Sequence, residues 1–94
     1  MSKLPEARDA EEREGNAEED SRYVGRAIEI ERTKARLTQG DLAQLSGVSQ
    51  PHICSIEKGN WSPKLNTIML IAEALGVDVN ALLPPNRRDA AYKS

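Results

Sequence analysis

From Ser21 onward, hydrophobic residues recur at helical spacing in short stretches that are separated by breaks containing glycine. The first stretch predicts a helix that starts near Ser21 and ends before Leu37. Its apolar face consists of Val24, Ala27, Ile28 and Ala35. Ile30 lies off this face, so we expect it to be exposed.

The next two helices have clear start and stop signals. Thr38 with Asp41 three residues later is an acidic variant of the capping box, and Gly47 ends the helix that follows. A third helix begins at Ser49 and is closed by Gly59. Its predicted buried side consists of Ile53 and Ile56. The break between the two helices is only three residues long, so they must cross steeply, which is the geometry of a helix-turn-helix.

Two further helices complete the predicted fold. The fourth ends at Gly76, and its apolar face consists of Leu65, Ile68, Ile71, Ala72 and Leu75. A short fifth helix is capped by Asp78, runs through Leu82 and Leu83 and stops at Pro84-Pro85. No stretch alternates with the period of a strand. The sequence therefore predicts a compact all-α domain of five helices, with a helix-turn-helix at helices 2 and 3.

Composition excludes several classes of protein. The chain has 94 residues, enough for one small domain, and holds one Cys and one His. It therefore cannot form an internal disulfide or a four-ligand zinc site by itself. The sequence has no pair of acidic residues suited to acid-base catalysis, no nucleophile with a neighbouring base and no glycine-rich phosphate-binding loop. We therefore expect that the protein is not an enzyme and binds no cofactor. No apolar run is long enough to span a membrane, so we expect no membrane contact and a cytoplasmic location.

Charge divides the chain into three parts. Residues 1–20 carry a net charge of -5 and almost no large apolar side chain, which predicts a disordered acidic arm. This arm either keeps the protein soluble or competes with phosphate or contacts a partner. Residues 21–83 carry +1 and form the predicted helix-turn-helix domain, and residues 84–94 carry +2 and form a short tail.

Several short motifs resemble the lambda-repressor-like (Cro/repressor, Xre) helix-turn-helix family. They are Thr-Gln-x-x-Leu-Ala, Gly-Val-Ser, Ile-x-x-Ile-Glu-x-Gly and Ala-x-Ala-Leu-Gly-Val, in the family's order and spacing, and the resemblance covers about residues 22–83. It implies a transcription regulator that binds double-stranded DNA with the third helix in the major groove. Arg36 stands where the family often has glycine. Because a left-handed Arg costs on the order of 1 kcal/mol, we expect a differently shaped turn there.

The resemblance also implies roles for single residues. Those expected to contact base edges are Gln50, Pro51 and Ser55. Gln50 can pair with both N6 and N7 of an adenine, Pro51 offers only apolar contact, and Ser55 can donate or accept. Those expected to contact phosphate are Gln39, His52, Lys58, Asn60 and Lys64, with solvated side chains as the alternative for each. Arg32 and Glu57 match a structural ion pair of the family. Cys54 is expected to be half-buried.

We expect the working unit to be a homodimer on an inverted repeat, because one recognition helix reaches too few base pairs to select a site. The apolar residues available for pairing are Met69, Leu70, Val79, Leu82 and Leu83. Two alternatives remain. One is an antitoxin or restriction-modification controller of the same fold, with a toxin as partner if it is an antitoxin. The other is an interaction scaffold that does not read DNA.

Overall fold

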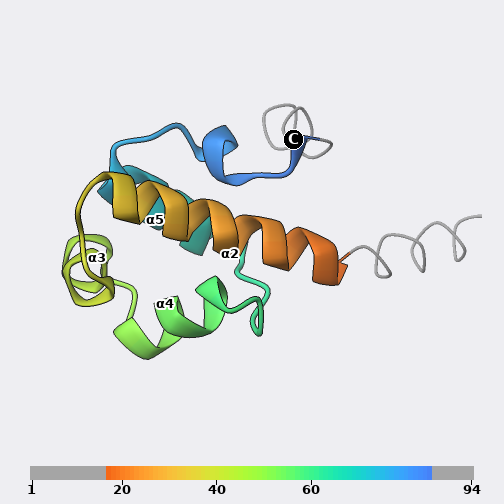
Figure 1. The fold of residues 1–94 in the computed structure, drawn as a ribbon, viewed down its shortest axis with the longest axis horizontal. Coiled ribbons are helices and arrows are strands. Elements are labelled where there is room, and N and C mark those ends of the chain that lie inside the picture. The colour runs from red at the N-terminus through yellow and green to blue at the C-terminus, as the bar shows by residue number, and fades with distance from the viewer. Residues whose placement is uncertain (1–16, 86–94) are drawn as a thin grey trace, which may run out of the picture.

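The computed structural model describes residues 17–85, which contain four α-helices, one short 3-10 helix and no strand (Figure 1). The elements are α2 (Ala17–Lys34), α3 (Gln39–Ser46), α4 (Gln50–Glu57), α5 (Leu65–Leu75) and η1 (Val79–Leu82). The all-α prediction is confirmed. Within this part of the chain, no helix combines the length and the apolar character needed to cross a membrane. The remaining residues of the predicted acidic arm and tail, 1–16 and 86–94, lie outside the described part.

The first helix starts earlier than predicted. It begins at Ala17 rather than near Ser21, so residues 17–20 of the predicted arm are helical. Glu18, Glu19 and Asp20 occupy its first turn, where negative charge interacts favourably with the helix dipole. Ile30 is exposed, as predicted. Ala35 was wrongly assigned to the buried face, because the helix ends before it and leaves it exposed.

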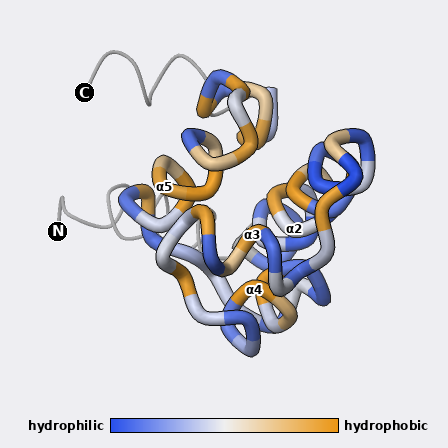
Figure 2. Tube along the Cα trace, turned by 90° about the vertical axis from the view of Figure 1, so that its left-hand side faces the viewer, coloured by the Kyte–Doolittle hydropathy of each residue, from blue (hydrophilic) through white to orange (hydrophobic). Residues whose placement is uncertain are grey.

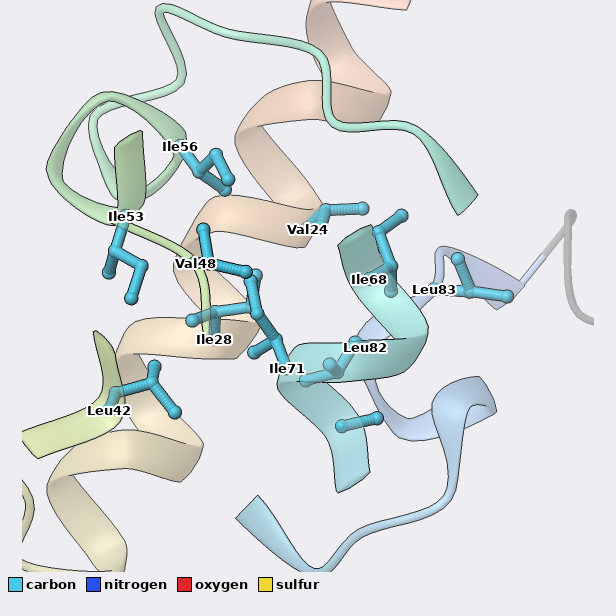
Figure 3. Packing of buried hydrophobic residues seen from close by; sticks show 11 residues of the cluster. Val24, Ile28, Leu42, Val48, Ile53, Ile56, Ile68, Ile71, Leu82 and Leu83 are labelled. Atoms are coloured by element: carbon cyan, nitrogen blue, oxygen red, sulfur yellow. The ribbon is translucent and has the colours of Figure 1, made fainter. Parts of the chain in front are cut away.

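The core lies where α2 meets the other helices, with α4 on one side of α2 and η1 on the other (Figure 1). Side chains from all five elements point toward one another there, as Figure 3 shows. The fully buried ones are Ile28, Leu42, Ile53, Ile56, Ile71 and Leu82. Leu65 was predicted to be buried but is exposed, because it occupies the first position of α5, at the edge of the packed helices.

The last predicted helix is a single 3-10 turn. Asp78 caps it by accepting a hydrogen bond from the backbone N–H of Asn80 at 2.8 Å. Leu83 already has an extended backbone, and Pro84 follows it, so the turn cannot continue as an α-helix. The cap was therefore predicted correctly and the helix type was not.

In the turn between α2 and α3, Arg36 adopts the left-handed conformation that we expected it to avoid. Arg36 has a φ of 61°, so the expectation of a different turn was wrong. The backbone N–H of Leu37 donates to the carbonyl of Arg32 at 3.0 Å, and that of Arg36 donates to Thr33 at 2.9 Å. These bonds satisfy carbonyls at the end of α2, which offsets the cost of the strained residue.

Gly25 sets the distance between α2 and α4. It is buried inside α2, and a Cβ added to it would overlap the carbonyl oxygen of Ile56. Glycine is unfavourable inside a helix, so its position here is explained by the close approach of the α4 backbone. α4 therefore lies closer to α2 than any residue with a side chain would allow.

Replacing Gly25 with alanine is expected to lower the free energy of unfolding by about 1–3 kcal/mol, because the two helix backbones must move apart. Urea unfolding followed by circular dichroism measures this change. Gly40→Ala is the matched control, since a Cβ at that helical position meets only ordinary contacts at 3.4 Å or more. Equal stability of the two variants would contradict the close packing.

Candidate nucleic-acid interface

α3 and α4 form one unit through a tightly bonded turn. Gly47 has a φ of 81° and ends α3, with its N–H donating to Ala43 at 2.9 Å. The hydroxyl of Ser46 accepts from the N–H of Val48 at 3.1 Å, and the hydroxyl of Ser49 accepts from the N–H of His52 at 3.3 Å. The predicted stop at Gly47 and the predicted start at Ser49 are therefore confirmed, and the short turn makes the two helices cross (Figure 1).

The start of α3 has a complete capping box, in which Thr38 and Asp41 each bond to the backbone of the other. Asp41 donates its backbone N–H to the hydroxyl of Thr38 at 2.9 Å, and its carboxylate accepts the backbone N–H of Thr38 at 3.0 Å. This backbone hydrogen bond from Thr38 lowers the pKa of Asp41 below its ordinary value. The N–H groups of Gln39 and Gly40 have no acceptor within the helix. They therefore present partial positive charge at the surface, as an anion site requires.

α4 presents one exposed face. Pro51 and Lys58 are exposed and Ser55 is half-buried. Their spacing of four and three residues places them on the same side of the helix. Ile53 and Ile56 lie on the opposite, buried side, as predicted. Cys54 is half-buried, also as predicted.

Gln50 lies at the edge of this face, beside the first turn of α3. A Cβ added to Gly40 would lie 3.4 Å from the side-chain oxygen of Gln50. Gly40 thus lies beside the side chain of Gln50 at ordinary van der Waals distance. Gln50 itself is exposed and available to a ligand.

The predicted ion pair between α2 and α4 is present and largely buried. Arg32 donates from Nε to Glu57 Oε2 at 2.7 Å and from Nη2 to Oε1 at 3.1 Å, in a bidentate arrangement. Their side chains are 15% and 5% exposed. The hydrogen bond to Glu57 raises the pKa of Arg32 and outweighs the opposite effect of burial. Nη1 of Arg32 also donates to the carbonyl of Leu37 at 2.8 Å, so the pair holds the turn before α3 as well.

Gln39 belongs to this network, which the sequence did not indicate. Its side-chain amide donates to Glu57 Oε1 at 2.9 Å. Gln39 was expected either to reach a phosphate or to be solvated, yet it is half-buried and tied to the ion pair. The second N–H of its side-chain amide and its backbone N–H are the donors that a phosphate contact would use.

His52 also has a partner that sequence analysis missed. Its ring meets that of Trp61 edge to face, with centroids 5.1 Å apart and an interplanar angle of 87°. The Nε2 atom is buried and has no hydrogen-bond partner among the described residues. His52 is therefore not the freely solvated side chain that was the alternative to a phosphate contact. Lys58, Asn60 and Lys64, also expected at phosphates, are all exposed.

Two of the five residues predicted for the dimer interface are unavailable. Leu82 and Leu83 are buried in the core of the single chain, because the 3-10 turn folds back onto α2 and α5. Met69 and Leu70 are 50% and 39% exposed, and Val79 is half-buried. These three residues border a hollow of about 410 Å³ together with Asn66, Ala72, Glu73 and Val77.

Comparison with known proteins identifies relatives of this unit. The model of the helix-turn-helix family HTH_3 matches residues 28–82. The immunity repressor protein of Bacillus phage phi105 is 35% identical over 60 residues, which cover 64% of this chain and 42% of the repressor. The chain thus spans less than half of that relative's length. An uncharacterised HTH-type transcriptional regulator of Sinorhizobium fredii is 34% identical over 64 residues, 68% of this chain and 83% of that protein.

Solved structures have the same fold. The crystal structure of the restriction-modification controller protein C.AhdI from Aeromonas hydrophila is similar with a TM-score of 0.65 and 28% identity. The match covers 67% of this chain and 96% of that one. The family model and the relatives thus agree on a helix-turn-helix protein, and two of the relatives are named as a repressor and a transcriptional regulator.

Replacing Glu57 with glutamine is expected to cost roughly 3 kcal/mol of folding stability, because it leaves the Arg32 charge buried without its partner. Urea unfolding measures the loss. Glu31→Gln is the matched control, since Glu31 pairs with Lys34 at 3.4 Å at the surface and such pairs contribute less than about 1 kcal/mol. A loss at Glu57 no larger than that at Glu31 would contradict the structural role of the pair.

Proposed function

Because this chain belongs to the helix-turn-helix family HTH_3, whose match spans more than half of it, we propose that it regulates transcription by binding a specific DNA sequence with α4 in the major groove. The family consists of DNA-binding regulators and not of enzymes. The observation that carries the proposal is the exposed face of α4, held in a defined orientation by the Arg32–Glu57 pair.

Three side chains of α4 are proposed to read bases. Gln50 is exposed at the first position of the helix and has an amide that matches N6 and N7 of adenine. Ser55 provides a hydroxyl for a donor or acceptor on the exposed face that it shares with Pro51. Pro51 provides apolar contact, for example to a thymine methyl.

The flanking groups are proposed to hold the DNA backbone. Lys58, Asn60 and Lys64 are exposed at and after the end of α4, where they can reach phosphates. The capped start of α3 supplies the backbone N–H groups of Gln39 and Gly40. Uncharged contacts of this kind explain how a segment with a net charge of only +1 in residues 21–83 binds a polyanion.

We propose further that two copies bind an inverted repeat and pair through α5. α5 is coloured hydrophobic along most of its length in Figure 2, although only one side of it faces the core. Met69 and Leu70 remain exposed, and Val79 borders the same hollow. A contiguous apolar patch of this kind is typical of an interface.

A second candidate is control of a restriction-modification system. It is favoured by the similarity to the controller C.AhdI, of which this chain covers 96%. This role uses the same DNA-binding face and differs in the genes that are regulated. The genes that neighbour this one would distinguish the two roles.

Gln50→Ala and Ser55→Ala are expected to weaken binding to the preferred duplex by roughly 1–3 kcal/mol and to change binding to random duplex much less. The preferred duplex is obtained by selection from a random pool, and fluorescence anisotropy measures both affinities. Lys58→Ala should weaken both affinities similarly, because phosphates carry no sequence information.

Gln44→Ala is the matched control for Gln50→Ala, since Gln44 is exposed on α3 and has no proposed contact with DNA. Equal losses on preferred and random duplex for Gln50→Ala would refute base reading by that residue. If selection with the wild-type protein enriches no duplex above background, the proposed function is refuted and the scaffold alternative is favoured.

Leu70→Lys is expected to abolish cooperative binding to the inverted repeat while leaving the binding of a single half-site intact, because it places a charge in the proposed α5 interface. Insertion of roughly five base pairs between the half-sites should have the same effect, since it turns one site to the opposite side of the duplex. Ile30→Lys is the control, because Ile30 is exposed on α2 outside this patch. One chain per operator at saturation, measured by sedimentation, would contradict the dimer.

A further inference from the structure

We propose that Trp61 is an additional DNA contact, on the backbone opposite to the one held by α3, and that His52 positions its ring. This inference rests on the proposed function, because it needs α4 in the major groove. It assigns a role to an exposed aromatic side chain that the motifs of the sequence left without one.

Trp61 is held beside α4 although it lies in the loop that follows it. The side chain is 51% exposed, yet its ring meets that of His52 edge to face at 5.1 Å. His52 belongs to the first turn of α4, so the loop must fold back along the helix to bring the two rings together. The ring is therefore fixed on one side and open to a ligand on the other.

The position of His52 defines on which flank of α4 the ring lies. Successive residues of a helix are 100° apart, so Gln50 and Glu57 share one flank and His52 lies on the other. Glu57 contacts Gln39 of α3, and Gln50 lies beside Gly40 of α3. α4 thus has α3 on one flank and Trp61 on the other, and its exposed face with Pro51 lies between them.

This arrangement matches the shape of the proposed target. The major groove is about 12 Å wide, close to the diameter of a helix with its side chains, and a phosphate backbone runs along each wall. A helix that fills the groove brings its two flanks to the two backbones. The start of α3 then meets one backbone, and Trp61 meets the other.

The chemistry of the indole suits this location. The indole N–H is a hydrogen-bond donor only, so it can donate to a phosphate oxygen. The flat face of the ring can pack on a deoxyribose. Lys58 and Lys64, at the two ends of the loop, are exposed and add positive charge. Glu18, which borders the hollow beside Trp61, is paired with Arg22 at 3.8 Å, so its charge is compensated.

Trp61 is the single tryptophan of the chain, so its fluorescence reports directly on this contact. Titration with the preferred duplex should change the emission of Trp61 with the same midpoint as the anisotropy of labelled DNA. Trp61→Ala should weaken binding roughly tenfold on preferred and random duplex alike, as the loss of a hydrogen bond to a charged group does.

The dependence on salt separates this contact from that of a lysine. Trp61→Ala should leave the slope of log K against log salt unchanged, because no charge is lost. Lys58→Ala should reduce that slope by about 1. A reduced slope for Trp61→Ala would mean that neighbouring charges had moved, and would overturn a direct contact by the ring.

Variants of His52 test its positioning role. His52→Phe keeps an aromatic edge and should bind like wild type, whereas His52→Ala should bind like Trp61→Ala. The double variant Trp61→Ala with His52→Ala should lose no more than either one alone, because the two residues act through one contact. If His52→Phe loses as much as His52→Ala, the imidazole itself contacts DNA and the positioning role is wrong.

Thermal unfolding of each variant shows that it is folded. If wild type binds the preferred duplex and Trp61→Ala binds it equally well, with no change of emission in wild type, the contact is refuted and the proposed function stands. In that case the exposed ring is free for a protein partner. If wild type binds no duplex, the proposed function fails, and this contact fails with it.

Discussion

The bidentate pair between Arg32 and Glu57 is the interaction on which the geometry of this protein depends. It joins the end of α2 to the end of α4 and, through the carbonyl of Leu37 and the amide of Gln39, also holds the turn and the start of α3. Apolar packing of Ile53 and Ile56 holds α4 against the core but has little directional preference. The pair supplies the direction, so the exposed face of α4 has one orientation.

A DNA reader of this size needs that orientation, because a small rotation of the recognition helix would move every side chain relative to the bases. The glycine at position 25 contributes to the same end, since it lets the backbones of α2 and α4 approach closely. Gly40 of α3 lies beside Gln50. One residue without a side chain, Gly25, and one ion pair thus determine where the proposed reading face is presented.

The same small core limits what else the domain can do alone. Leu82 and Leu83 are buried against α2 and α5, where they stabilise the fold of the single chain. They are therefore not available to contact a second chain. Met69 and Leu70 remain exposed on α5 and are the side chains proposed for association. Domains of this length bury a smaller fraction of their surface than larger domains do, so few apolar residues remain for a second purpose.

The sequence by itself determined the features that depend on neighbours in the chain. The capping box of Thr38 and Asp41, the turn at Gly47 and the apolar spacing within the helices all involve residues a few positions apart. The structure has them as predicted, except for Ala35 and Leu65, which lie at helix ends and are exposed. The Arg32–Glu57 pair, 25 positions apart, was predicted only because the chain resembles a known family.

The tertiary structure decided every feature in which distant segments compete for one space. The partner of Gln39, the ring contact between His52 and Trp61 and the burial of Leu82 and Leu83 follow from how the helices cross and how the last turn folds back. Hydrophobic periodicity shows that a side has to be buried but not against which element. The angles and distances between helices, which no local pattern encodes, settle that choice.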